Sequence, residues 1–165
     1  IGLHPSYETY CDPAQLAKER DILTRSMQHL VPDIEVTECR QHFLRWSVHE
    51  TAAHQSSAGL QVDSTLGYAD AAGFRAGVCY EFGMYDLKRR TQLTIRQRPL
   101  IAMEVSLFGE NYMNVANHDA ALDILLRLKQ NCLQFDGDFR LLWHNNMLRT
   151  KADRAVYAQV VSGRE

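Results

Sequence analysis

The fold class follows from residues 1–43, which read IGLHPSYETYCDPAQLAKERDILTRSMQHLVPDIEVTECRQHF. The segment begins with the apolar tail of a predicted strand, residues 1–3, and ends with a second predicted strand, residues 36–43. Between them Asp12 is a typical helix N-cap, because a proline takes the first helical position and a glutamine follows three residues after the cap. We predict a helix from there to about Leu30. Strand, helix and strand in this order predict a parallel pair joined by a crossover helix.

The rest of the chain continues this alternation. We predict a short helix that a Ser47/Glu50 capping box opens and Gly59 closes, and a helix that Asn117 caps and Asp136-Gly137 ends. Further strands are expected at 60–66, 93–95, 100–108 and 139–143, and a closing helix at 154–161. The order predicts one α/β domain over residues 1–165 with mainly parallel strands. A complete eight-unit barrel takes roughly 250 residues, so we expect a distorted or incomplete (β/α) barrel.

Composition restricts the class of protein. The chain is 45% hydrophobic and 23% charged, which is typical of a folded domain. Its net charge of -2 argues against a nucleic-acid-binding surface. No apolar stretch approaches the roughly 20 residues that span a bilayer. The four cysteines form no Cys-x-x-Cys pair, so we expect free thiols in a reducing compartment and a cytoplasmic protein. Because the first residue already lies in a predicted strand, we expect the chain to be the C-terminal part of a longer protein.

Polar side chains stand where the predicted strands end. In parallel α/β proteins, ligands bind beyond the carboxyl ends of the strands, so these side chains are expected at one shared rim. They include imidazoles that can bind a metal, a carboxylate that can accept a proton, and guanidinium groups that can hold an anion. Such a set suits metal-assisted hydrolysis. The residues are His4, Arg40, His42, Asp63, Arg75 and His144.

The order of these segments resembles the NodB-type polysaccharide deacetylases, the family 4 carbohydrate esterases, and in particular a divergent bacterial branch. The similar segments are 1–6, 40–45, 59–68, 73–77 and 141–145, which together extend over nearly the whole chain. The resemblance implies a distorted (β/α) barrel that removes acetyl groups from N-acetylated sugars. It also implies a divalent metal cofactor, often zinc, and a carbohydrate substrate as the partner.

Residue roles can be carried over from the family one position at a time. His4 is similar to the first histidine of the family's metal-binding His-x-x-x-His motif, and Glu8 stands where the second is expected. His144 is similar to the late histidine that protonates the leaving amine. Arg40 takes the place of an arginine that orients the catalytic base, and Asp63 lies near a carboxylate that tunes the late histidine. The family's aspartate pair, which supplies the base and a metal ligand, would precede Ile1.

Other roles stay open at this point. His42 alternates with Arg40 and is either a third metal ligand or a structural residue. Arg75 either contacts substrate or pins its own loop, and Tyr68 and Trp143 either stack on sugar rings or pack in a core. Asp63 can equally cap the turn that follows it.

Because Glu8 stands where the family has a histidine, and because the aspartate pair is absent, two further interpretations of the whole chain stay open. One is a catalytically degenerate module that binds carbohydrate or regulates an enzyme. The other is half of a split site, which residues upstream or another polypeptide would complete.

Overall fold

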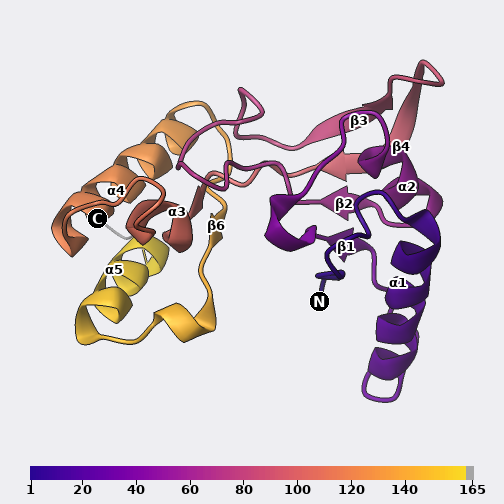
Figure 1. The fold of residues 1–165 in the computed structure, drawn as a ribbon, viewed down its shortest axis with the longest axis horizontal. Helices are drawn as coiled ribbons and strands as arrows, with labels where there is room; N and C mark the ends of the chain where they lie inside the picture. The colour runs from indigo at the N-terminus through magenta and orange to yellow at the C-terminus, as the bar shows by residue number, and fades with distance from the viewer. Residues whose placement is uncertain (163–165) are drawn as a thin grey trace. The chain divides into compact units, whose positions relative to one another are not determined.

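The computed structural model describes residues 1–162, which form two compact units. The first unit consists of residues 1–66 and 81–98, and the second of residues 67–80 and 99–162. Figure 1 labels the helices and strands of both units. Within residues 1–162, no helix is both long and apolar enough to cross a membrane.

The first unit is built on a four-stranded sheet in the order β1-β2-β4-β3 (Figure 1). Its strands are β1 (Glu38–Cys39), β2 (Val62–Asp63), β3 (Phe82–Asp86) and β4 (Thr91–Gln97). The first three in this order are parallel, and β3 pairs with β4 in an antiparallel hairpin. The start of the chain joins the sheet next to β1, through a parallel bridge between Leu3 and Cys39.

Two helices pack on this sheet, α1 (Pro13–Gln28) and α2 (Thr51–Ser57). The side chain of Asp12 caps α1 as predicted, because it accepts hydrogen bonds from the backbone amides of Ala14 and Gln15. The predicted capping box of α2 is wrong, since the Glu50 side chain makes no cap and instead pairs with Lys88 at 2.8 Å. Helix α2 ends before Gly59, whose φ of +78° suits a residue without a Cβ.

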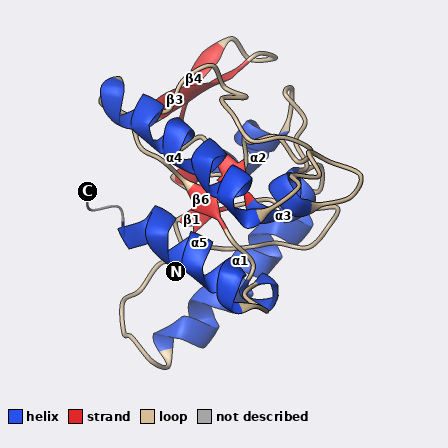
Figure 2. Ribbon diagram, turned by 90° about the vertical axis from the view of Figure 1, so that its left-hand side faces the viewer, coloured by secondary structure: helices blue, strands red, loops and turns tan. Residues whose placement is uncertain are grey.

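The second unit contains a parallel pair of short strands, β5 (Ala102–Met103) and β6 (Leu141–Leu142), and three helices. The helices are α3 (Glu104–Phe108), α4 (His118–Gln134) and α5 (Lys151–Ser162). Helices α4 and α5 lie side by side (Figure 2) and bury Leu125, Val156 and Val160 in one apolar cluster. Two single turns complete the elements, η1 (His42–Leu44) in the first unit and η2 (Asn145–Met147) in the second.

The α/β class with a mainly parallel sheet is confirmed, while the described residues form no closed barrel. Other local predictions also differ from the structure. The strand expected over residues 36–43 is reduced to β1, and residues 42–44 form the turn η1. Residues 100–108 form β5 followed at once by α3, so the extended segment is much shorter than its apolar pattern predicts. The strand β3 was not predicted. It forms because Asp86 accepts hydrogen bonds from the backbone amides of Lys88 and Arg89, which closes the turn into β4.

Candidate functional site

The parallel bridge between Leu3 and Cys39 brings together two histidines of the first unit. The amide of Arg40 donates to the Leu3 carbonyl at 2.9 Å, so the residues that follow both segments emerge at the same edge of the sheet. There His4 Nδ1 lies 2.8 Å from the carbonyl oxygen of Arg40, and His4 Nε2 lies 3.0 Å from Nδ1 of His42. The two imidazole ring centres are 5.0 Å apart.

The turn η1 that carries the second histidine has an uncommon backbone. Phe43 and Leu44 follow one another with φ of +55° and +53°, a left-handed conformation that costs a non-glycine residue roughly 1–2 kcal/mol. Buried polar contacts just before the turn hold it in place. The amide of Gln41 donates to Thr65 Oγ1 at 2.9 Å, and Thr9 Oγ1 donates to the Gln41 side-chain oxygen at 2.9 Å. The strained turn is therefore fixed by the core beneath it.

Exposed aromatic rings lie next to the two histidines. Phe43 meets His42 edge to face with ring centres 4.6 Å apart, and Tyr7 meets Phe43 in the same way at 5.6 Å. Phe43 is 71% exposed and Tyr7 is 49% exposed. The histidine pair therefore borders an apolar surface that a ligand can reach.

Glu8, the expected partner of His4, has a different contact. Its carboxylate pairs with Arg45 at 3.1 Å, and the Arg45 guanidinium also stacks over the rings of Tyr7 and Tyr10 at 3.8 and 4.0 Å. Within residues 1–162, no group of three or more His, Cys, Asp or Glu is placed to hold a metal ion. Glu8 therefore does not join the two histidines in this structure.

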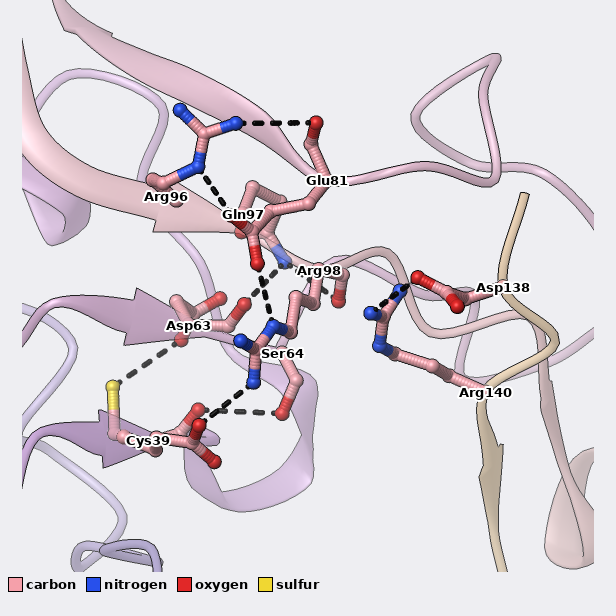
Figure 3. A network of polar contacts seen from close by, with 10 residues as sticks. Cys39, Asp63, Ser64, Glu81, Arg96, Gln97, Arg98, Asp138 and Arg140 are labelled. Carbon is pink, nitrogen blue, oxygen red and sulfur yellow. Dashed lines mark hydrogen bonds and ion pairs between the residues drawn. The ribbon is translucent and has the colours of Figure 1, made fainter. Parts of the chain in front are cut away.

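Asp63 is fully buried in the sheet of the first unit (Figure 3). Its carboxylate accepts hydrogen bonds from the amide and hydroxyl of Thr65 at 2.7 and 2.5 Å, from Gln55 at 2.7 Å and from the Cys39 thiol at 3.4 Å. Burial raises the pKa of Asp63, and these hydrogen bonds act against that rise. Asp63 therefore joins β1, β2 and α2 through a buried polar cluster.

Arg40, directly after β1, donates from Nε to the Ser64 carbonyl at 3.0 Å. The nearby charges of the sheet are arranged in ion pairs (Figure 3). Arg98 contacts Glu81 at 2.6 Å and Glu38 at 2.7 Å, and Arg96 also pairs with Glu81. The hydrogen bond from Arg98 is the largest cause of the lowered pKa of Glu81. These charges hold strands together.

The second unit pairs a buried carboxylate with an exposed histidine. Strands β5 and β6 are in parallel register, so Glu104, directly after β5, and His144, two residues after β6, emerge at the same end. Oε1 of Glu104 lies 2.6 Å from Nδ1 of His144. The Glu104 side chain is fully buried, while that of His144 is 44% exposed.

The contact of this dyad engages Nδ1 of His144. When Glu104 is ionised, its carboxylate can only accept a hydrogen bond, and Nδ1 then carries the proton between the two groups. Nε2 is then the ring nitrogen left to give or take a proton, which is how a carboxylate orients a histidine in general acid–base catalysis. The dyad can therefore transfer a proton to or from a bound molecule.

The three residues expected to bind substrate lie in the second unit. Trp143 is half-buried in its apolar core, where its ring meets Tyr157 at 5.5 Å. Arg75 donates to the carbonyl of Gly67 at 3.0 Å and so pins its own loop. Tyr68 is exposed. A role in binding sugar remains a prediction for all three.

Glu104 is the site residue that the sequence analysis missed. A signal was available, since an acidic residue stands directly after the apolar run of residues 99–103. The expectation of one long strand over 100–108 placed Glu104 inside the strand and hid its position at the end. Asp63 was expected to tune His144, whereas the carboxylate that contacts His144 is Glu104.

No family model, curated protein or solved structure matches this chain.

Proposed function

We propose that this chain is a polysaccharide deacetylase-like domain, on a distorted or incomplete (β/α) barrel, that hydrolyses the N-acetyl group of a carbohydrate with the help of a divalent metal such as zinc. The observation that carries the proposal is the Glu104–His144 dyad, with its 2.6 Å hydrogen bond between a buried carboxylate and an exposed imidazole. The order of motifs supports the choice of substrate, because the late histidine of that family meets the leaving amine. All four cysteines are free, which fits a cytoplasmic location.

In this reaction water adds to the acetamide carbonyl, the carbon–nitrogen bond breaks, and acetate and a free amine leave. The departing amine needs a proton, and we assign its donation to Nε2 of His144. Glu104 keeps Nδ1 protonated and stabilises the imidazolium before that transfer. When bound, a divalent metal would activate the water and polarise the carbonyl.

The test is acetate release from a soluble N-acetylglucosamine oligomer, with zinc or cobalt supplied. His144→Ala should lower kcat by roughly 10²–10⁴, the usual contribution of a general acid. His29→Ala is the matched control, since it removes an exposed imidazole from the end of α1 and should leave kcat unchanged. Unchanged turnover in the His144 variant would remove the proton-transfer role.

A second function is favoured by the ion pair of Glu8 with Arg45 and by the exposed rings of Tyr7 and Phe43. A module that has lost catalysis would still bind sugar rings on such aromatic surfaces. It would bind the oligomer in calorimetry and release no acetate, and Phe43→Ala would weaken that binding.

A further inference from the structure

The spacing of two imidazole nitrogens in the first unit matches a pair of ligands on one metal ion. At Zn–N bonds of about 2.0–2.1 Å, two histidines on a tetrahedral ion have nitrogens roughly 3.3 Å apart and ring centres roughly 5 Å apart. His4 Nε2 and His42 Nδ1 are 3.0 Å apart, and their ring centres are 5.0 Å apart. The rings need only tilt to direct both lone pairs to one point.

The second nitrogen of His4 is already held as a metal-binding histidine requires. A backbone carbonyl only accepts hydrogen bonds, so the 2.8 Å contact with the Arg40 oxygen places the proton on Nδ1 of His4. The lone pair of a neutral His4 is then on Nε2, the atom that faces His42. A contact of this kind, from the other ring nitrogen to a carbonyl, typically orients a metal ligand.

The position of His42 is also set before any ligand arrives. The turn that carries it is strained at Phe43 and Leu44. It is held by hydrogen bonds of the buried residue Gln41, whose amide donates to Thr65 and whose side-chain oxygen accepts from Thr9. A ligand that is fixed in advance loses little conformational entropy on binding. The ring of Phe43 lies against His42 and gives the pair an apolar border on one side.

From these contacts we propose that His4 and His42 bind one divalent transition-metal ion, His4 through Nε2 and His42 through Nδ1. Imidazole nitrogens suit Zn²⁺, Co²⁺, Ni²⁺ and Cu²⁺, and two of them leave the other coordination positions open to water or to a substrate oxygen. We leave Glu8 out of the ligand set, because its carboxylate pairs with Arg45. The inference rests on the proposed function only for what the ion does, and metal binding itself is independent of it.

The first experiment needs no variant. Zinc is added to the purified chain, and long-range ¹H–¹⁵N NMR spectra follow the imidazole nitrogens. Saturation should shift Nε2 of His4 and Nδ1 of His42 together, and should leave the ring nitrogens of His144 and His49 in place. If saturating zinc changes the chemical shift of neither nitrogen, the proposal is wrong.

Variants then assign the affinity. In calorimetric titrations with zinc, His4→Ala and His42→Ala should each lower the zinc affinity by at least about 10-fold. Even the mutation of a residue that only hydrogen-bonds to a metal ligand typically lowers the affinity by that much. His49→Ala is the matched control, because it removes an exposed histidine from the same unit. Glu8→Gln should bind zinc as the unaltered chain does, and an equal loss there would make Glu8 a ligand and overturn the assignment. His42→Asn repeats the measurement should the alanine variant unfold.

Failure of this inference and failure of the proposed function give different results. The His144→Ala variant should lose acetate release and keep its zinc affinity, whereas His42→Ala should lose the zinc affinity. A chain that binds zinc through both histidines and releases no acetate refutes only the deacetylase. Acetate release without zinc binding at the pair refutes only the metal site.

Discussion

The contact between Glu104 and His144 predicts the size of a catalytic effect. Glu104→Gln keeps the shape of the side chain and removes its charge, so the 2.6 Å hydrogen bond to His144 is no longer charge-assisted. A hydrogen bond to a charged group contributes about 1.5–3 kcal/mol. If that stabilisation is made only while His144 carries its extra proton, kcat falls by about 10- to 150-fold, since about 1.4 kcal/mol is tenfold in rate.

The assay is acetate release from an N-acetylglucosamine oligomer, with kcat and KM measured separately. Because Glu104 is fully buried and acts through His144, KM should change little. The variant carrying both His144→Ala and Glu104→Gln should be no slower than His144→Ala alone, since a positioning residue has nothing left to position. Independent losses that multiply in the double variant would refute this reasoning.

A stability measurement separates positioning from folding. Glu104→Gln removes a charge from a fully buried site, a change that is often neutral or stabilising. The thermal unfolding midpoint of the variant should therefore not fall. An NMR spectrum of the unaltered chain at pH 8 should show the His144 proton on Nδ1, and a proton on Nε2 instead would contradict the proposed tautomer.

Three further predictions concern stability. The hydrogen bond with His118 is the largest cause that lowers the pKa of Asp153 to about 2. The stability that ionised Asp153 provides should therefore be lost as pH falls from about 4 toward 2. Asp153→Asn should remove this loss from acid unfolding curves. Burial raises the pKa of Asp63, so its ionised form costs stability at neutral pH. The urea concentration at the unfolding midpoint should therefore rise as pH falls through the raised pKa of Asp63 toward 3.8, the usual pKa of an aspartate. Asp63→Asn should abolish this rise. A Cβ at Gly137 would overlap the Cys79 thiol, so Gly137→Ala should cost roughly 1–3 kcal/mol in urea unfolding, and Cys79→Ala should recover part of it.

The neighbourhood of His4 could be predicted because it depends on short-range patterns. Each strand end is marked in the sequence by an apolar run followed by polar residues, and parallel strands place those ends at one edge. The structure indeed brings His4, Arg40 and His42 into contact. The direct contact between the two imidazoles could not be predicted, since it depends on the left-handed turn at Phe43 and Leu44, and neither residue type favours that conformation.

The partner of His144 could not be predicted, for a different reason. Glu104 and His144 are 40 residues apart in the chain, and they meet because β5 and β6 pair in a particular register. The acidic residue after the apolar run 99–103 marks a strand end, but it does not record which strand pairs with β5 or in which register. Register between remote strands is set by packing, which local patterns do not record.

Asp63 and Glu104 are both fully buried, and their hydrogen bonds distinguish a structural carboxylate from one that contacts an exposed histidine. Burying a charge is expensive, and a structural site offsets the cost with several hydrogen bonds. Asp63 has such a site, since Thr65, Gln55 and Cys39 together direct four donor groups at its oxygens. Glu104 has none, because among the described residues its Oε1 meets only the exposed imidazole of His144 and its Oε2 has no partner. A carboxylate that is buried at this cost and hydrogen-bonded to one exposed histidine fixes the orientation of that imidazole, which is the role that the proposed function requires of Glu104.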